Sequence, residues 1–419
     1  ADVQLGYWVN DTDFVPMSDP SDDAATPADA VRVVTRQSGT AATSAVGTFF
    51  LRFVGFDRFT VATSATAKIF QSQCAYDGLI AQGKVILSTK QRFLGEYCVH
   101  GEEGIDLAND NYFGPDTIVS TEDEDTCGQS DPKCKDSSNP GIEDAYMEQT
   151  LFGTYVDENG DPILDENDEP VLFGKVAKIG NYYDSIVGNT GEYSAAQAGA
   201  DLNDDGFIGE GETVNRISVG RNTPLNVLDL KEDMVNIIEC PFKGGPDSFN
   251  VKLELDAVYM NDPAYTNYPA DGVLNLDGIA IVGDDCDFTF DSTVTYVNAT
   301  IATNATGTKT FQGGAGTVLG VDDNTGTFGD PTWSCTKGNE VTLITMGSVH
   351  FAAKLEAYDL EIIAADDVML AARVDDSIHV GTSVTAGGDI HVTTSHDFLA
   401  CDGMTSSVFD PIMIYALVQ

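Results

Sequence analysis

Basic side chains are scarce in this sequence: 21 Lys and Arg residues stand against 67 Asp and Glu residues, and the formal net charge is -46 over 419 residues. A surface this acidic repels phosphate backbones and anionic lipid headgroups, which excludes nucleic acid as a partner. So many carboxylates are tolerated where salt screens their repulsion over about 8 Å and where divalent cations bridge them. We therefore expect a saline, calcium-containing setting outside the cell or at the cell surface.

Long apolar runs are also missing. The most apolar stretch, residues 49–56, contains Arg52 and is far shorter than the roughly 20 residues that a membrane-spanning helix needs. We therefore expect no direct membrane insertion of this chain. The chain opens at Ala1 without an initiator Met or a basic leader, so we expect a processed or trimmed form.

The cysteines lack any CxxC pair, which excludes zinc-finger spacing. Their even number predicts up to four disulfides in an oxidising compartment, although 105 pairings are possible and buried free thiols are the alternative. The short separation of Cys127 and Cys134, which follow an acidic segment, indicates a local disulfide. The full set is Cys74, Cys98, Cys127, Cys134, Cys240, Cys286, Cys335 and Cys401.

The chain is mainly β by its patterning. In residues 1–70, β-branched and polar residues alternate over 3–9, 30–36 and 59–67, with Asp, Pro and Ser clusters between these stretches. This predicts an N-terminal β-domain. The apolar stretch 411–419 is expected to be a strand that closes a β-helix or pairs with a neighbour.

Residues 241–419 carry repeats at 19 and 22 residues, each with two short strands, which is typical of a parallel β-helix. Alternate residues should point outward in a stack, namely His350, Met369 and His391. Residues 71–150 have short strands broken by Gly and Asn and predict the first coils, with an acidic disulfide loop. The residues expected to point inward are Val349, Phe351, Val368, Leu370, Ile390 and Val392.

Residues 151–240 are expected to form an insertion between these coils. Residues 157–164 are nearly repeated as 165–172, with turn residues before each apolar pair, which predicts a β-meander. Near-helical spacing of apolar residues over 225–238, after Thr223 and Pro224, predicts a helix. A shorter helix is expected within 142–152.

A twelve-residue loop in this insertion, residues 201–212, meets the requirements of an EF-hand calcium loop. Gly206 supplies the sharp turn at position six, and a strand at 214–219 replaces the second helix. The alternative is an ordinary acidic turn. We predict a structural Ca²⁺ clamp whose ligands come from Asp201, Asn203, Asp205, the Phe207 carbonyl, a water beside Gly209, and Glu212.

Catalytic constellations are weak, and we predict no catalytic residues. Ser395, His396 and Asp397 are adjacent on a strand, so their side chains point to opposite faces and cannot form a relay. His350 and His391 are expected to be ladder residues, with metal binding as the alternative. Carboxylate pairs lie where turns belong; they are Asp284-Asp285, Asp322-Asp323, Asp366-Asp367 and Asp375-Asp376.

Several short motifs together resemble the TadG-like proteins of Flp (Tad) pilus assembly. They are Gln4-Leu5-Gly6-Tyr7-Trp8, residues 30–33, Phe49-Phe50, residues 61–67, residues 98–105, residues 236–240, Cys286 to Phe290, residues 345–353 and Phe398 to Cys401. The resemblance implies a role in pilus-linked surface adhesion and carries over no catalytic residues. The family's membrane helix is missing here, and residues 151–221 look like an insertion.

We therefore expect a secreted, calcium-stabilised structural protein of the bacterial cell surface that acts in adhesion or extracellular filament formation. Its partners are expected to be further copies of the chain, joined through 411–419 or 1–9, or a cell-surface or glycan ligand. Two alternatives stay open: a β-helix enzyme that acts on acidic polysaccharides, and a carbohydrate-binding adhesin that does not assemble. The enzyme is disfavoured because a polyanion substrate needs cationic subsites.

Overall fold

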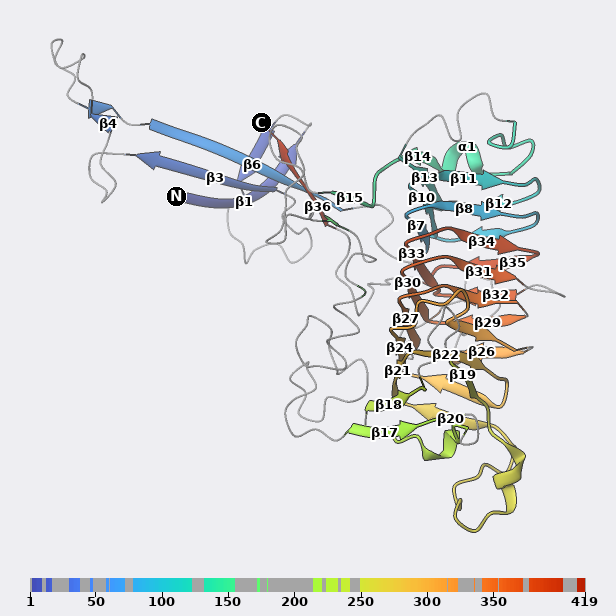
Figure 1. Cartoon of the computed structure of the whole chain (residues 1–419). Coiled ribbons are helices and arrows are strands. Elements are labelled where there is room, and N and C mark those ends of the chain that lie inside the picture. Colours follow the sequence, from blue (N-terminus) through green and yellow to red (C-terminus); the bar gives the residue numbers. More distant parts are fainter. Residues whose placement is uncertain are drawn as a thin grey trace. The chain divides into compact units, whose positions relative to one another are not determined.

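The computed structural model describes residues 2–9, 13–16, 30–37, 46–47, 58–59, 61–71, 78–122, 132–154, 172–173, 179, 214–220, 224–232, 235–241, 249–314, 316–322, 335, 341–352, 354–371, 377–401 and 413–418. These residues are mainly in strands, as predicted. The chain divides into two compact units, one formed by residues 1–72 with 411–419 and the other by residues 73–410. Each unit has its own sheets (Figure 1).

The first unit is a five-stranded sheet in the order β2 (Asp13–Pro16), β1 (Asp2–Val9), β3 (Ala30–Gln37), β6 (Val61–Gln71) and β36 (Met413–Val418). All of its pairs are antiparallel, and a separate short pair joins β4 (Val46–Gly47) to β5 (Arg58–Phe59). The predicted strands at both ends of the chain are confirmed. β36 pairs with β6 at one edge of this sheet, and β1 pairs with β3 through Asp2 to Gly6 and with β2 through Gly6 to Val9. Assembly through either end of the chain stays a prediction.

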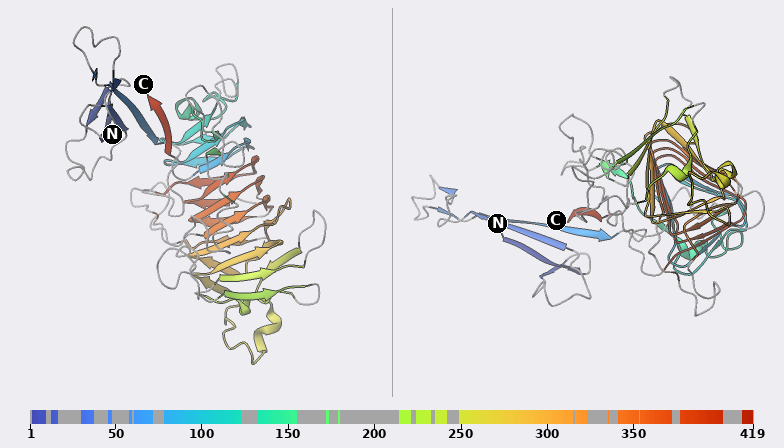
Figure 2. Two further views of the ribbon diagram at one scale, coloured as in Figure 1. Left: turned by 60° about the vertical axis from the view of Figure 1, so that its left-hand side comes forward. Right: turned by 90° about the horizontal axis from the view of Figure 1, so that it is seen from below.

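The second unit contains three parallel sheets that wind around one core, the arrangement of a parallel β-helix (Figure 2). The first sheet runs β14 (Tyr146–Glu148), β13 (Ile118–Thr121), β10 (Cys98–Gly101), β7 (Gly78–Ala81), β33 (Ser383–Ala386), β30 (Leu360–Ala364), β27 (Val341–Thr345), β24 (Ala299–Thr303), β21 (Ala280–Asp284), β18 (Val235–Glu239) and β17 (Val214–Ser218).

The second sheet runs β11 (Gly104–Leu107), β8 (Lys84–Leu87), β34 (Ile390–Thr393), β31 (Val368–Ala371), β28 (Val349–Phe351), β25 (Phe311–Gly313), β22 (Cys286–Phe290) and β19 (Phe249–Leu253). The third runs β12 (Tyr112–Phe113), β9 (Arg92–Leu94), β35 (His396–Leu399), β32 (Ser377–Val380), β29 (Leu355–Tyr358) and β26 (Thr317–Leu319). Two-stranded sheets join β20 (Leu274–Asp277) to β23 (Val294–Val297), and β15 (Gly153–Thr154) to β16 (Leu172–Phe173).

The coils are not stacked in the order of the sequence. β7 opens the solenoid in its middle, and the next coils build outward through β10 and β13 to β14 (Figure 1). The chain then reappears at the opposite end of the same sheet as β17 and winds back until β33 pairs with β7. Residues 149–213, which include most of the predicted insertion, therefore connect the two ends of the first sheet. Ten strand spacings of ~4.8 Å separate those ends by roughly 48 Å.

The corners that follow β20, β23, β26, β29 and β32 use residues that tolerate a left-handed backbone. Gly278, Asn298, Gly320, Asp359 and Gly381 occupy these corners in five successive coils, and all have positive φ angles. Glycine has no Cβ to clash in that conformation, and Asn and Asp tolerate it better than other residues. In the first coils, Gly101 and Gly104 border the turn between β10 and β11, and Asn109 lies between β11 and β12, so these Gly and Asn breaks are coil corners, as predicted.

The core lies between the three sheets and is filled by one side chain in two from each strand. The six residues predicted to point inward are all buried, and His350, Met369 and His391 face each other on the outer side of adjacent strands. Phe93 stacks on Phe113 with ring centroids 5.3 Å apart. The predicted inward and outward pattern of these coils is confirmed.

The helix predicted for residues 225–238 is wrong. This stretch contains one turn of 3-10 helix, η4 (Val227–Asp229), and then strand β18, which pairs with β17 and β21. β18 is buried along most of its length, and packing between two strands overrides the weak helical spacing. The second predicted helix shrinks to α1 (Ile142–Ala145), and η5 (Ala257–Asn261) was not foreseen.

Disulfides are present, as predicted. Cys240 bonds Cys286, and Cys335 bonds Cys401, with Cα atoms 5.5 and 5.4 Å apart. Cys98 and Cys134 are disulfide-bonded as well. The predicted Cys127–Cys134 pairing and the predicted β-meander at 157–172 involve residues outside the described ones.

Candidate functional sites

The predicted calcium ligands Asp201, Asn203, Asp205, Phe207, Gly209 and Glu212 lie outside the described residues. The structure places the residues that follow them, since β17 begins at Val214 and forms the last strand of the first sheet. Within the described ranges, no group of three or more His, Cys, Asp or Glu side chains is arranged to hold a metal ion. The Ca²⁺ site stays a prediction from the sequence.

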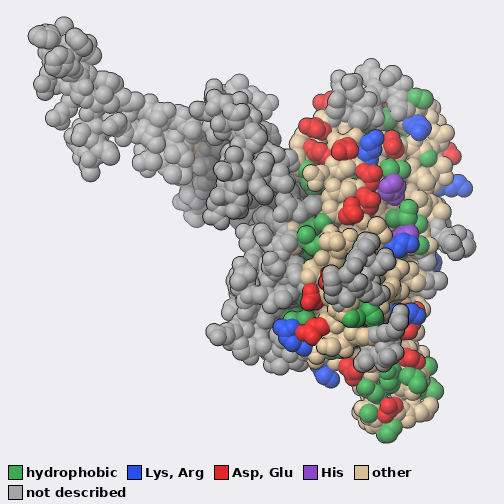
Figure 3. Space-filling model, in the orientation of Figure 1, with side chains coloured by type: hydrophobic (Ala, Val, Ile, Leu, Met, Phe, Trp, Pro, Cys, Tyr) green, Lys and Arg blue, Asp and Glu red, His purple; other side chains and the backbone are tan. Residues whose placement is uncertain are grey.

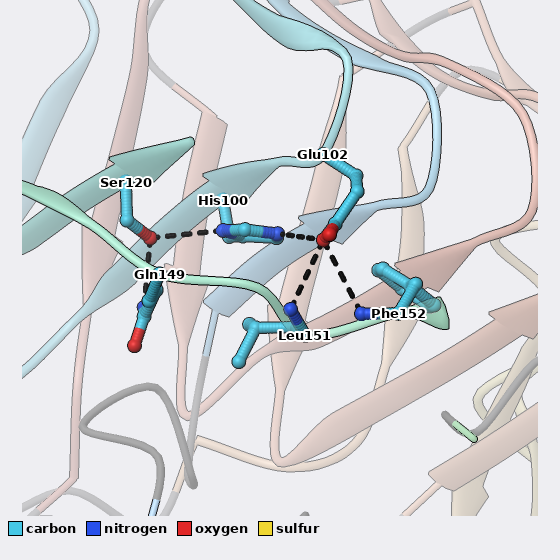
Figure 4. A network of polar contacts seen from close by, with 6 residues as sticks. All are labelled: His100, Glu102, Ser120, Gln149, Leu151 and Phe152. Carbon is cyan, nitrogen blue, oxygen red and sulfur yellow. Dashed lines mark hydrogen bonds and ion pairs between the residues drawn. The ribbon is translucent and has the colours of Figure 1, made fainter. Parts of the chain in front are cut away.

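A polar network on the first sheet joins two neighbouring coils to the chain that leaves β14 (Figure 4). His100 lies in β10, with its Nδ1 2.9 Å from Ser120 Oγ in β13 and its Nε2 2.7 Å from Glu102 Oε2. Gln149 Nε2 donates to Ser120 Oγ at 2.7 Å. Because the Glu102 carboxylate can only accept, the His100 Nε2–H donates to it; in the neutral imidazole Nδ1 is then an acceptor, and the Ser120 hydroxyl donates to it.

The same carboxylate oxygen of Glu102 accepts two backbone N–H groups, from Leu151 at 3.0 Å and from Phe152 at 3.2 Å. Both of these side chains are buried in a small apolar cluster with Ile80 and Cys98. The network therefore fastens residues 149–152 onto the outer face of the first sheet. A carboxylate that collects several donors in this way is a strong anchor, because charge-assisted hydrogen bonds are about twice as strong as neutral ones.

The order Ser120, His100, Glu102 is also that of a nucleophile, a base and an orienting acid. A nucleophile must be reachable by its substrate, yet the Ser120 and His100 side chains are both fully buried. The geometry therefore favours a structural role, in which the network holds residues 149–152 against the first sheet. Sequence reasoning missed this network, although His100 and Ser120 are separated by one coil of 20 residues, the spacing that the register shows for Cys98 and Ile118 as well.

The histidine ladder on the second sheet is a surface feature. His350 and His391 each lie opposite Met369 on adjacent strands, so they are two strand spacings apart, roughly 9.6 Å. Met369 lies between them, so the two imidazoles are not neighbours in the ladder. Burial and the nearby Lys309 lower the pKa of His350 below its usual value.

Ser395, His396 and Asp397 point to opposite faces, as predicted. Asp397 Oδ2 accepts from Arg92 Nη1 at 3.1 Å, whereas the His396 ring is buried and its Nδ1 lies 2.9 Å from His379 Nε2. Burial lowers the pKa of His396 to about 4, and burial together with His396 lowers the pKa of His379 well below its usual value. This is a neutral histidine pair inside the core.

The paired carboxylates that the structure describes lie at turns and stabilise them. Asp284 accepts from Asn304 Nδ2, and Asp285 has a positive φ of 55°. Asp366 accepts from Ser348 Oγ, and Asp367 accepts from the backbone N–H of Asp389. The turn assignment is confirmed for these two pairs, while Asp323, Asp375 and Asp376 lie outside the described residues.

A shallow groove of about 520 Å³ opens on the third sheet. Lys90 and Arg92 bring two cations to it, and two carboxylates among its lining residues balance them. Acidic side chains are widespread over the face of the molecule in Figure 3. Tyr112 is 40% exposed and also lines a second groove of about 920 Å³ beside the first. The remaining residues of the first groove are Leu94, Asp110, Ser395 and Asp397.

Two parts of the chain match known families. Residues 1–67 match a family described as Tad-like Flp pilus-assembly. The N-terminal residues thus resemble a pilus-assembly family. Residues 252–402 match a family described only as a domain of unknown function (DUF7867). No curated protein and no solved structure matches the chain.

The two matches follow the architecture. The Tad-like match covers the strands of the first unit as far as β6, and the second match begins within β19 and ends two residues after Ala400, where the last coil of the solenoid ends. The predicted relation to Tad pilus assembly is confirmed at this level, which suggests a pilus-related role and association with the cell surface. Among the described residues, no helix is long and apolar enough to cross a bilayer.

Proposed function

We propose that this protein is an extracellular structural component of a Tad-type pilus system, of the TadG-like kind, that acts in adhesion or filament formation at the bacterial surface. The observation that carries the proposal is the Tad-like match of residues 1–67. These residues form most of a sheet to which the last strand of the chain, β36, adds itself, so both ends of the chain contribute to one pilus-related unit.

The solenoid suits a scaffold outside the cell. Its core runs through successive coils, and its described cysteines are disulfide-bonded, as in extracytoplasmic compartments. The predicted Ca²⁺ loop directly precedes β17, the end strand of the first sheet. We propose that calcium clamps this end in media where the ion is plentiful, since extracellular sites of this type bind with a Kd of ~0.1–1 mM.

Immunogold electron microscopy of intact cells that carry the gene tests the proposal. The expected result is label on the cell surface or on fibres outside it, lost in a gene-deletion strain and restored by a plasmid copy. The deletion strain should also attach less well to a surface. Label that is found solely inside permeabilised cells would contradict the extracellular role, and unchanged pili and attachment would contradict the pilus-linked one.

The groove beside Tyr112 favours a second candidate function, a carbohydrate-binding adhesin. An exposed aromatic ring can stack on a sugar face, and the polar side chains beside it, among them Lys90 and Ser395, can hydrogen-bond the sugar hydroxyls. Binding of the purified protein to immobilised glycans, compared with the Tyr112→Ala variant, tests this function. Equal retention of both proteins would count against the groove.

A further inference from the structure

The solenoid is assembled from two parts of the chain that meet at one junction. We define the N-terminal part as residues 1–152 and the C-terminal part as residues 214–419. Outside the solenoid, the two parts also pair through β6 and β36. At the junction, β7 pairs with β33, β8 with β34 and β9 with β35. Every sheet of the solenoid is therefore continued across a contact between strands that lie about 300 residues apart in the sequence.

Polar contacts reinforce the junction around its whole circumference. Asp389 Oδ1 accepts from the backbone N–H of Lys84 at 2.7 Å, and the Tyr97 hydroxyl donates to the Thr382 carbonyl at 2.9 Å. Arg92 and Asp397 form an ion pair at 3.1 Å. These contacts are hydrogen bonds, ion pairs and packing, so the junction can open and re-form.

Disulfides close within each part. The four cysteines of the C-terminal part bond one another, as Cys240–Cys286 and Cys335–Cys401. The other four cysteines of the chain all lie before residue 135, so the disulfides of Cys98 and Cys134 belong to the N-terminal part. Each part is thus cross-linked internally, and strand pairing is left to hold the two together.

Each part also has features that mark where it ends. The Glu102 network fastens residues 149–152 to the coils of the N-terminal part. The family match at residues 252–402 covers the coils of the C-terminal part from β19 onward and stops at the junction, so those coils form a unit recognisable without the N-terminal ones. Residues 149–213 could extend to roughly 200 Å, far beyond the ~48 Å between the ends of the first sheet, so their length does not restrict the N-terminal part to its own chain.

We propose that the junction is an exchangeable interface between copies of this chain, in which the N-terminal part of one copy completes the solenoid of a second. Either part without the other exposes three strand edges, and such edges pair with any matching edge. Pairing between two chains makes the same contacts as pairing within one, which is the condition for domain swapping. Because the two surfaces differ, repeated exchange joins copies head to tail into an open filament.

This inference deepens the filament role in the proposed function and specifies its contact. Ile86 and His391 are Cα partners across the junction, on the outer side of β8 and β34. Facing residues on adjacent strands are close enough for a disulfide. One full-length variant carries Ile86→Cys and the other His391→Cys, and both are produced together in one cell and oxidised after purification.

If copies exchange their N-terminal parts, we expect a covalent dimer that contains one copy of each variant. It would be seen on a non-reducing gel, and a different tag on each variant would identify both copies. The double variant Ile86→Cys/His391→Cys in one chain confirms that the pair can cross-link. Asp106→Cys with His391→Cys is the matched control, because Asp106 lies one strand beyond Ile86 and is too far away to bond. A second facing pair, Arg92→Cys with Asp397→Cys, repeats the test if the first does not fold.

Mixed dimers well above the Asp106→Cys control support the exchange. If the double variant cross-links within one chain while co-produced single variants stay monomeric, the junction closes solely within each chain and the inference is wrong. That result would not affect the proposed surface location and Tad-like role, because those are tested separately in cells. Failure of the exchange can therefore be told apart from failure of the proposed function.

Discussion

Phe93 and Phe398 stack face to face across the junction of the solenoid, with ring centroids 5.1 Å apart and ring planes 7° from parallel. Phe93 also stacks on Phe113 in the next coil. The aromatic core therefore passes without interruption from the C-terminal coils into the N-terminal ones. At this position the ring contact across the junction is as close as the one within the N-terminal coils.

Replacing Phe93 with Ala should destabilise the solenoid strongly. The side chain is fully buried, and its loss removes two aromatic stacks and leaves a cavity. Changes of this type cost ~3–5 kcal/mol. Chemical denaturation followed by circular dichroism measures the loss, and Tyr112→Ala on the surface of the same sheet serves as the control, expected to cost well under 1 kcal/mol. Equal effects of the two changes would contradict the packing described.

The Glu102 network makes a local prediction. Glu102→Ala removes the acceptor of two backbone N–H groups and of the buried His100 ring, and each unsatisfied buried group costs ~1–3 kcal/mol. We expect faster hydrogen exchange at Leu151 and Phe152 before any global unfolding. The neighbouring Glu103 is exposed, so Glu103→Ala is the matched control and should leave exchange unchanged. Slow exchange in both variants would show that the network does not hold this segment.

The buried histidine pair should make stability depend on pH. The folded-state pKa of His396 is about 4 because the ring is buried, and that of His379 is also lowered, whereas both are near 6.5 when unfolded. The unfolded state therefore binds more protons below pH 6.5, and stability falls as the pH drops from 6.5 towards 4. His396 contributes roughly 3 kcal/mol to this loss. The free energy of unfolding measured at pH 7 and at pH 4.5 checks the prediction, and the double variant His379→Phe/His396→Gln should flatten the slope.

The coils of residues 341–401 could be predicted from the sequence because each residue's face follows from a two-residue alternation repeated at nearly constant spacing. Val349, Val368 and Ile390 recur at the same position of successive coils, so burial of one implies burial of all. Local pattern and final structure agree here because neighbours in the sequence are also neighbours in space.

The winding order could not be predicted in this way. Nothing in residues 78–94 indicates that their coil lies against residues 383–399, because parallel strand edges are chemically alike and pairing across 300 residues leaves no periodic trace. β18 was missed for a related reason: its burial between β17 and β21 decided its conformation, and that context lies outside its own sequence. The Glu102 network depends on the same coil-to-coil register.

Calcium should stabilise the end of the first sheet next to β17. The predicted ligand Glu212 supplies two oxygens and lies two residues before this strand. We expect Glu212→Gln to weaken Ca²⁺ binding by an order of magnitude or more, ~1.4 kcal/mol or above, in isothermal titration calorimetry. Glu210 is not at a ligand position of the loop, so Glu210→Gln is the matched control. A chelator should speed hydrogen exchange at the backbone amides of Val214 to Ser218 and leave those of β27 and β30 protected. Equal protection of β17 with and without calcium would contradict the clamp.

Cutting the chain between the two parts should leave them associated, because non-covalent contacts hold them together. A specific protease site inserted between Gly191 and Glu192 lies in the segment that connects the ends of the first sheet. After digestion, the two fragments should elute together from a sizing column, because the junction pairs three sets of strands. In denaturant they should separate even without a reductant, because the disulfides close within each part.

The same cleavage in the Ile86→Cys/His391→Cys variant should give fragments that separate only after reduction, which locates the contact at β8 and β34. Fragments of the native sequence that stay linked until reduced would mean that a disulfide crosses the junction, and an exchange of N-terminal parts between copies would then be impossible.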